Sequence, residues 1–459
     1  MRRKKLLLIN PGNPWFFYFT PPLALGYVAA VTSDNWDIEI VDEKTRRFNF
    51  ATAQADLVGI TVMTPQARRA YEISAVFTRR NIPVVLGGIH VSMRPQEASG
   101  YATAVVVGEA ENIWPKVLED FEAGKMAKIY ENKELVDLDT LPRPRRDLYG
   151  SYPASIIKTT RGCPFNCDFC CISAFNKRRY RLRPVDDVVD EMKGIKHKVL
   201  FVADDNIVGS GRQQDDERAM SLFEAMVQKE TRKTWGSQAS INVANNPEIL
   251  RMMRKAGCAS LLIGFEALET SALKGRGKYQ NVQMASNEDY YSQVVNALHA
   301  HGIAVNGFFF NSHEDTQKSF ERMANFLAKS DIDLVTHTIL TPLPGTVLFD
   351  KTLPKLCFRQ FPADWEKYDF SRLLAAPSHM TRSQFYHTRH KMIQKTHSWP
   401  RIFRITLQGL LHSHSPLMAF LLLISHYNQR KFFHKELRRN LAELKGSTHP
   451  SAFDSISMY

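Results

Sequence analysis

Short runs rich in β-branched residues alternate with helix-length segments along most of this chain. In the first series these runs are residues 5–9, 37–41, 57–62, 83–86 and 104–107. In the second series they are residues 156–159, 199–203, 234–239, 260–265, 304–310 and 334–340. Strands separated by helices predict parallel sheets whose faces are covered by those helices. The chain is therefore expected to be an α/β protein with two such sheets.

The two series divide the chain into domains. Residues 1–134 are expected to form a Rossmann-like doubly wound sheet, whose ligands bind at the carboxyl ends of the strands. The proline-rich residues 135–151 predict a linker. The six strand-and-helix units of residues 152–348 predict a partial (βα)6 barrel of the TIM type. Residues 349–459 are expected to be a mainly helical, basic C-terminal region.

Four of the six cysteines fall within nine residues, at positions 163, 167, 170 and 171. Such clustering in a long chain is typical of metal ligands in a reducing compartment, not of a disulfide framework. We therefore expect a cytoplasmic protein. Cys258 and Cys357 stand alone and are predicted to be packed core thiols, as is Cys171.

Cys163, Cys167 and Cys170 follow the pattern CxxxCxxC on a loop that begins with glycine. A structural zinc site usually takes four protein ligands in two pairs, and this triplet has no second half. Three thiolates on a four-iron cluster would leave one iron open to another ligand. A structural zinc site is the alternative interpretation.

This spacing, with the aromatic Phe169 before the last cysteine, resembles the signature of the radical S-adenosylmethionine superfamily. The resemblance implies that the three cysteines hold a 4Fe-4S cluster whose open iron binds the amino and carboxylate groups of S-adenosylmethionine. One electron then cleaves that molecule to methionine and a 5′-deoxyadenosyl radical. It also implies a reducing partner such as flavodoxin or ferredoxin.

The same resemblance implies S-adenosylmethionine contacts at the ends of later strands. The implied contacts are Phe169, Asp205, Asn206, Gln238, Ser240, Glu266 and Leu343. Asp204, Asp205 and Asn206 depart from the family's usual Gly-Gly-Glu pattern at this strand end. Glu266 is expected to accept hydrogen bonds from ribose hydroxyls, and a structural role is the alternative for it.

The first domain resembles the cobalamin-binding domain that precedes the barrel in one branch of this superfamily. The resemblance rests on the Pro-Gly turn after the first strand and on residues 87–97 and 107–112. The implied cobalamin contacts are Trp15, Thr61, Thr64, Gly87, Gly88, His90, Gly108 and Glu109. No Asp-x-His-x-x-Gly motif is present, so no histidine is expected on cobalt. A domain that keeps the fold but binds nothing is the alternative.

The net charge of +13 is concentrated in part near the C-terminus, where residues 396–445 carry eight Lys or Arg against two acidic residues. No motif with interleaved aromatics accompanies this charge, so no nucleic-acid partner is expected. The apolar run of residues 417–424 is too short to span a bilayer. It predicts either a buried helix that covers the barrel or a helix that rests on anionic lipid at the inner membrane face.

Together these resemblances imply a cobalamin-dependent radical S-adenosylmethionine methyltransferase that acts on an unactivated carbon. Its substrate would be a small molecule, and a lipid-like one if the tail rests on a membrane. An enzyme that uses the same cofactors to join, cyclise or oxidise carbon centres without methylation is the first alternative. A cluster-bearing binding protein without turnover is the second.

Overall fold

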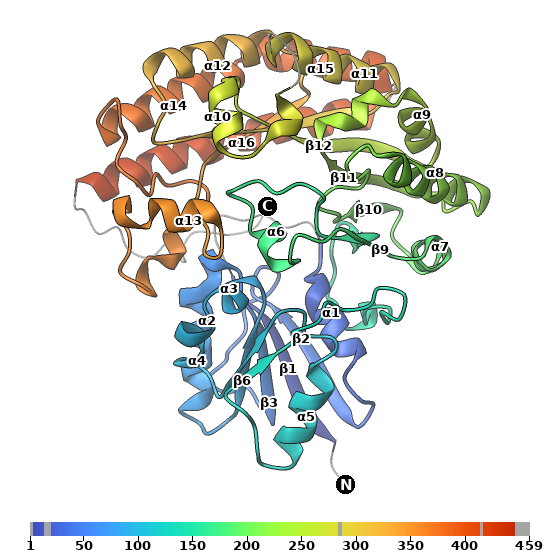
Figure 1. Cartoon of the computed structure of the whole chain (residues 1–459), viewed down its shortest axis with the longest axis vertical. Coiled ribbons are helices and arrows are strands. Elements are labelled where there is room, and N and C mark those ends of the chain that lie inside the picture. The colour runs from blue at the N-terminus through green and yellow to red at the C-terminus, as the bar shows by residue number, and fades with distance from the viewer. Residues whose placement is uncertain (1–2, 13–19, 283–286, 414–415, 446–459) are drawn as a thin grey trace.

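The computed structural model describes residues 3–12, 20–282, 287–413 and 416–445. The first domain lies below the barrel in Figure 1, and the C-terminal helices lie above it. Its sheet has the parallel strand order β2-β1-β3-β4-β5-β6. The strands are β1 (Lys4–Asn10), β2 (Trp36–Asp42), β3 (Leu57–Thr61), β4 (Val84–Gly87), β5 (Ala104–Val107) and β6 (Ile129–Glu131). Five of them were predicted, and β6 was not.

Helices cover both faces of this sheet, because alternate residues of β1 point to opposite sides. Leu6 and Leu8 pack with α1 (Leu23–Ala30) and α5 (Trp114–Glu122). Leu7 and Ile9 pack with α2 (Ala67–Thr78) on the other face. The short helices α3 (Ile89–Met93) and α4 (Pro95–Ser99) cover this second face as well. The doubly wound architecture predicted for the first domain is confirmed.

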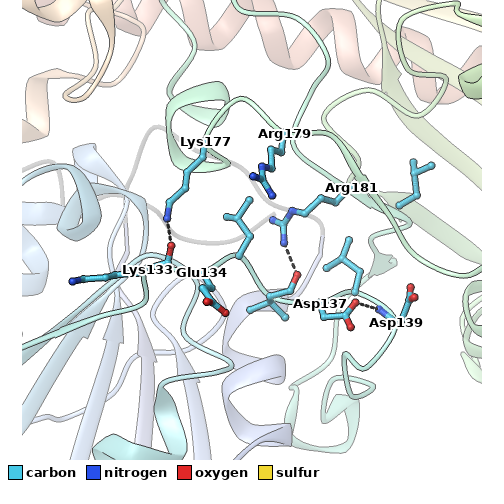
Figure 2. A pocket seen from close by; sticks show the side chains of 11 residues that line it. Lys133, Glu134, Asp137, Asp139, Lys177, Arg179 and Arg181 are labelled. Carbon is cyan, nitrogen blue, oxygen red and sulfur yellow. Dashed lines mark hydrogen bonds between the residues drawn. The ribbon is translucent and has the colours of Figure 1, made fainter.

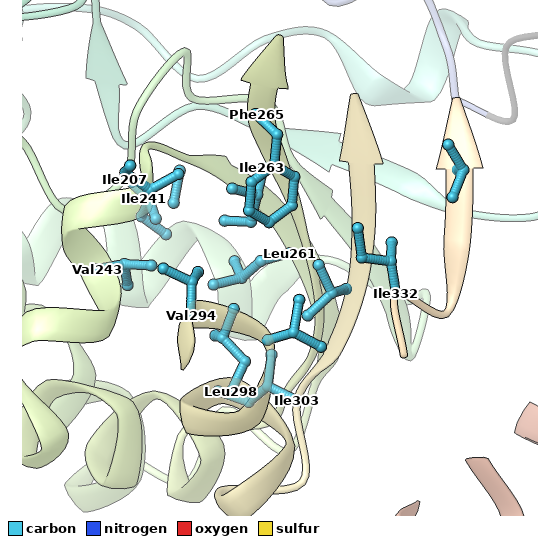
Figure 3. Packing of buried hydrophobic residues seen from close by; sticks show 14 of the residues in the cluster. Ile207, Ile241, Val243, Leu261, Ile263, Phe265, Val294, Leu298, Ile303 and Ile332 are labelled. Carbon is cyan, nitrogen blue, oxygen red and sulfur yellow. The ribbon is translucent and has the colours of Figure 1, made fainter. Parts of the chain in front are cut away.

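The second sheet is also parallel, in the order β14-β13-β12-β11-β10-β7. Its strands are β7 (Ser155–Ile157), β10 (Val199–Val202), β11 (Thr234–Ala239), β12 (Cys258–Glu266), β13 (Ala304–Asn311) and β14 (Leu334–Ile339). The helices between them are α7 (Val185–Gly194), α8 (Gln213–Gln228), α9 (Pro247–Lys255), α10 (Thr270–Gly275), α11 (Asn287–Ala300) and α12 (Gln317–Lys329). Figure 3 shows Leu261 and Ile263 of β12 in one apolar cluster with Val294 and Leu298 of α11. This open sheet is the predicted partial barrel.

Residues 349–375 return to the first domain after the barrel is complete. This segment includes the end of α13 (Val347–Thr352) and the turn at Ala363–Lys367, and it places Trp365 and Tyr368 in the apolar cluster beside α2. Trp365 Nε1 also donates to Glu97 Oε1 at 2.8 Å. The expected helical region therefore begins only at α14 (Arg382–Thr396).

The C-terminal helices α14, α15 (Trp399–Ser413) and α16 (Pro416–Leu444) cover the barrel near β14. On α16, His426, Phe433 and Glu436 are buried, which agrees with the predicted covering helix. The side chains of residues 417–421, which form most of the predicted apolar run, lie outside the described part of the chain. Within the described residues, no helix has the length and apolar character needed to cross a membrane.

The isolated cysteines differ in their surroundings. Cys258 is fully buried in the barrel core, as predicted, and Cys171 packs half-buried against the first-domain cluster. The prediction for Cys357 was wrong, because this residue is exposed. Leu356 forms an antiparallel bridge with Ala375 and points inward, so the next side chain along this extended backbone points to solvent.

Candidate functional site

The three predicted ligands lie on a loop enclosed by a small hairpin. Its strands, β8 (Thr160–Arg161) and β9 (Arg181–Leu182), pair antiparallel, and the loop runs from β8 to α6 (Cys171–Phe175). Gly162 has a φ of +87°, and a Cβ atom there would lie 2.1 Å from the carbonyl oxygen of Arg179. Only glycine fits this position, which explains why the loop begins with it.

The thiols of this loop are largely buried and act on one another electrostatically. Burial, reinforced by the neighbouring thiols, raises the pKa of Cys163 to about 12 and that of Cys167 to about 11. Burial also raises the pKa of Cys170. Across the described residues no three His, Cys, Asp or Glu side chains converge on a point that would bind a single metal ion. A zinc site requires such convergence. A four-iron cluster instead takes each thiolate on a different iron, so its ligands need not converge on a single point.

A buried lysine faces the same thiols. Lys278 Nζ lies 2.8 Å from Glu266 Oε1, and both side chains are at most 14% exposed. Although burial alone lowers the pKa of Lys278, the carboxylate of Glu266 and then the thiol of Cys167 raise it above its ordinary value. Glu266 has a φ of 71° at a register shift between β12 and β13, which directs its side chain towards this lysine.

Lys278 was not among the residues predicted from the sequence. The loop that carries it packs directly on the cysteine loop, since Asp168 N donates to the carbonyl oxygen of Arg276 at 3.0 Å. Gly277 adopts a φ of +66° where a Cβ atom would lie 3.8 Å from Cys167 Cα. The glycine-rich, basic stretch 274–278 was the available signal, because such a stretch allows close backbone approach.

The end of β10 places the predicted residues in different surroundings. Asp204 accepts hydrogen bonds from the backbone N–H of Thr159 at 2.7 Å and of Thr160 at 3.0 Å, so it holds the start of the hairpin. Asp205 accepts from Lys158 at 3.2 Å. Asn206 is fully buried and donates to Ser240 Oγ at 3.4 Å. Its Oδ1 atom has no partner within the described residues.

The remaining predicted S-adenosylmethionine contacts are spread over the site. The backbone carbonyl of Gln238 accepts from Ile207 N at 3.0 Å, close to Asn206 in sequence. Phe169 meets Phe310 of β13 edge to face, with ring centroids 5.7 Å apart. Leu343 is buried in the apolar cluster of the first domain.

A cavity of about 410 Å³ lies where the first domain meets the barrel. Five predicted cobalamin contacts line it, namely Thr61, Gly87, Gly88, Gly108 and Glu109. Its floor is apolar and includes Leu8, Val85 and Val106 of the sheet. Gly88 has a φ of +98°, and a Cβ atom there would lie 2.9 Å from Val62 N. Glycine backbone at the rim and an apolar floor fit a large cofactor with flat rings.

Arg161 of the barrel closes one side of this cavity, and Arg181 joins it in pairing with the same carboxylate. Arg161 pairs with Glu109 at 2.6 Å and with Glu111 at 2.5 Å. Arg181 pairs with Glu109 at 2.8 Å. Burial opposes ionisation of Glu109, but the hydrogen bonds from Arg181 and the charge of Arg161 lower its pKa. Glu109 therefore links the first domain to the hairpin that holds the cysteine loop.

Two predicted cobalamin contacts, His90 and Thr64, lie away from the cavity. His90 is 1% exposed, and its Nε2 atom lies 3.3 Å from the Tyr71 hydroxyl and 3.5 Å from Glu97 Oε1. Its Nδ1 atom lies 3.4 Å from Thr64 Oγ1. Both ring nitrogens therefore have protein partners, and neither His90 nor Thr64 lines the cavity. Trp15 lies outside the described residues.

Family models and relatives agree with this geometry. The model for the radical SAM superfamily matches residues 157–327, and that for the B12 binding domain matches residues 16–118. Bacteriochlorophyllide d C-12(1)-methyltransferase of Chlorobaculum tepidum is 31% identical over 82% of this chain and 83% of its own. The chain belongs to the cobalamin-binding branch of the radical S-adenosylmethionine superfamily. Its cofactors are a 4Fe-4S cluster, S-adenosylmethionine and cobalamin, and it is an enzyme.

Other members of this branch align over most of the chain. Hopanoid C-2 methylase of Rhodopseudomonas palustris is 29% identical over 72% of this chain and 64% of its own. The methyltransferase TsrM of Kitasatospora setae, solved with cobalamin and a [4Fe-4S] cluster bound, superposes with a TM-score of 0.66 at 17% identity. That match covers 96% of this chain and all of TsrM. The predicted fold class is thereby confirmed.

Proposed function

We propose that this enzyme transfers a methyl group to an unactivated carbon of a small, largely apolar molecule. The observation that carries the proposal is that both flanks of the cysteine loop line the cavity of the first domain. Arg161 precedes Cys163 by two residues, and Ile172 and Phe175 belong to the helix after Cys170. A substrate between them would meet residues of both cofactor sites, as radical formation and methyl donation at one carbon require.

In this proposal each group of residues has a distinct role. Cys163, Cys167 and Cys170 hold the cluster, and Lys278 pairs with the carboxylate of S-adenosylmethionine. Asn206 and Ser240 bind the same molecule, because the buried Oδ1 of Asn206 needs a donor. The cavity rim, from Thr61 to Gly108, holds cobalamin. Cobalamin supplies the methyl group when bound, and no histidine of the described residues is proposed as its cobalt ligand.

The substrate is proposed to be a small molecule with an extended apolar ring system. The named relatives act on bacteriochlorophyllide d and on hopanoids. Ile172 and Phe175 of α6, which line the cavity beside the cysteine loop, would supply apolar contact for a ligand of that general kind in this chain as well. Methylation adds a group that makes no hydrogen bond, so recognition would depend on shape and apolar contact.

We also propose that the enzyme contacts a membrane surface. Trp399, Phe403 and Leu407 follow one face of α15 and are 44%, 64% and 60% exposed. Arg430 borders this stripe, since its guanidinium lies 5.2 Å from the ring of Trp399, and on the same helix Lys431 lies 4.5 Å from the ring of the exposed Tyr427. Apolar side chains beside cations are typical of peripheral attachment to anionic lipid. Such attachment would give the enzyme access to lipid-like substrates.

The test uses the full chain with its cluster reconstituted under anaerobic conditions. The protein is given cobalamin, titanium(III) citrate, S-adenosylmethionine with a deuterated methyl group and a lipid-soluble extract of its host. Formation of 5′-deoxyadenosine, S-adenosylhomocysteine and a deuterium-labelled product is expected. 5′-Deoxyadenosine without S-adenosylhomocysteine would favour the non-methylating alternative. The absence of both would favour a binding protein without turnover.

A further inference from the structure

Three consecutive cations, Lys177, Arg178 and Arg179, form an exposed turn directly after α6; we call them the basic turn. Lys177 and Arg178 have φ values of 52° and 58°, a left-handed conformation that is uncommon outside glycine. Two backbone hydrogen bonds hold it, from Arg178 N to Ser173 O at 2.8 Å and from Arg179 N to Asn176 O at 2.9 Å. Strained backbone held in this way is concentrated at functional sites.

The basic turn lies against the cysteine loop from both ends. A Cβ atom on Gly162, the residue before Cys163, would lie 2.1 Å from the carbonyl oxygen of Arg179. At the other end only α6 and Asn176 separate Cys170 from Lys177. A helical path of seven residues spans about 10 Å. The basic turn is therefore a part of the protein surface that lies very near the cluster.

A recess of about 620 Å³ opens beside the basic turn (Figure 2). Its barrel wall carries Lys177, Arg179 and Arg181. The opposite wall, from the end of the first domain into the linker, carries Lys133 together with Glu134, Asp137 and Asp139. Arg181 forms an ion pair with Glu109 and donates a hydrogen bond to the carbonyl oxygen of Val136. Arg178 and Arg179 form no ion pair with any described residue. The barrel side of the recess therefore presents cationic groups that the fold does not neutralise.

The proposed reaction needs one electron from outside the described part of the chain. Apart from the four cysteines of this loop the chain has only Cys258 and Cys357, and two thiols do not supply the ligands of a second iron-sulfur cluster. A protein that delivers this electron must approach the cluster closely. Complexes of this kind bury little area, and complementary charge sets their rate of association.

We propose that the basic turn is the docking surface for an acidic, one-electron carrier protein of the flavin or iron-sulfur type. One electron passes from the carrier to the cluster, so that the carrier is oxidised by one electron and the cluster is reduced by one. The inference rests on the proposed function only in that the cluster must be reduced. Cationic groups on the turn attract the carrier, and salt weakens that attraction.

The test compares two variants of the full, reconstituted enzyme that each lose three positive charges. The first is Lys177→Asn/Arg178→Asn/Arg179→Gln, in which asparagine suits the left-handed positions. The control is Lys255→Gln/Lys318→Gln/Lys391→Gln, whose exposed lysines lie on α9, α12 and α14. The probe is a reduced flavodoxin of net negative charge. Flavodoxin binding and the rate of cluster reduction are measured over a range of salt concentrations, with titanium(III) citrate as the direct reductant.

At low salt the basic-turn variant is expected to be reduced by flavodoxin about tenfold more slowly and to bind it more weakly. The rate at which flavodoxin reduces this variant should depend less on salt concentration than the rate for the wild type. Its iron content and its rate of reduction by titanium citrate should equal those of the wild type. The control should match the wild type throughout. Unchanged reduction by flavodoxin in the basic-turn variant, or an equal loss in the control, would overturn the proposal. If the triple variant loses iron, the single Arg179→Gln variant replaces it under the same criteria. A failure of methyl transfer leaves these measurements unaffected, because they are made at the cluster.

Discussion

Lys278 Nζ lies 2.8 Å from Oε1 of Glu266, and this pair faces the thiols of Cys163 and Cys167. No other lysine among the described residues is both buried and directed at the cysteine loop. Removing one member of a buried pair leaves the other charge without compensation, which costs about 3 to 5 kcal/mol. In the proposed function, Lys278 of this pair supplies the cation that meets the carboxylate of S-adenosylmethionine.

The Lys278→Gln variant should bind S-adenosylmethionine at least tenfold more weakly, which corresponds to about 1.4 kcal/mol or more. The reason is the loss of the cation proposed to pair with its carboxylate. Equilibrium dialysis of the reconstituted protein measures the affinity, and iron analysis shows whether the cluster is retained. Lys278→Arg, which keeps the charge, should bind more tightly than Lys278→Gln. Wild-type affinity in Lys278→Gln would contradict the assignment.

Replacing Cys163, Cys167 or Cys170 with Ala should abolish binding of the four-iron cluster, because each supplies one thiolate that no neighbour replaces. Cys171→Ala is the matched control, since its side chain packs against the apolar cluster of the first domain. It should retain about four irons per chain by chemical analysis. Loss of the cluster in Cys171→Ala, with retention in Cys167→Ala, would reverse the ligand assignment.

Acid should destabilise the C-terminal helices through His426. Its Nε2 atom lies 2.8 Å from the carbonyl oxygen of Asp333, so this nitrogen carries the proton and Nδ1 accepts from His397 at 3.0 Å. Burial, followed by the charge of Arg401, lowers the pKa of His426 from 6.5 to about 4. As pH falls, His426 therefore takes up a proton at a higher pH in the unfolded chain than in the folded protein.

The contribution of His426 to the free energy of unfolding should consequently be constant above pH 7 and decrease between pH 6.5 and about 4, by about 3 kcal/mol. Urea titrations at a series of pH values measure this change. His426→Gln keeps a donor for Asp333 and should show a smaller decrease over that range. If the free energy of unfolding decreases equally with falling pH in the wild type and in His426→Gln, then His426 is not the titrating group.

The wild type should sediment with phosphatidylglycerol vesicles at low salt and remain in solution with phosphatidylcholine vesicles. Each Lys or Arg near anionic lipid contributes about 1 kcal/mol, and the exposed stripe on α15 adds apolar contact. Phe403→Ser/Leu407→Ser and Lys431→Gln/Arg438→Gln should each weaken the attachment. Arg430 and Arg439 are left unchanged because they bond to His397 O and Asp369 within the fold. Wild type that stays in solution with both lipids would refute the membrane contact.

Local patterns were enough to predict most of the sheet and the cluster ligands. The buried runs of β1 and β3 are continuous, and parallel strands covered on both faces have this character. The three cysteines lie within one loop, so their spacing could be compared with the family signature, and that resemblance predicts them as the ligands. Strand β6 was missed because three residues, of which only Tyr130 is buried, carry no periodic signal.

Contacts made by distant parts of the chain were not accessible from the sequence. His90 stands on a glycine turn that suggested a ligand contact, yet Trp365 packs against its ring with centroids 5.0 Å apart. That pairing depends on how residues 349–375 return to the first domain. Lys278 reaches Glu266 only because β12 shifts register at its end. Neither arrangement has a signature in local composition.

The chain runs from the first domain through the barrel and then, at residues 349–375, back to the first domain. Unfolding the first domain would expose Trp365 and Tyr368 to solvent, because the apolar residues that bury them belong to that domain. Losing this segment would in turn expose the face of α2. The two units are thus mutually dependent, and they should melt in one calorimetric transition despite having separate sheets. A fragment that ends before residue 349 would lack Trp365 and Tyr368, and with them part of the apolar core of the first domain.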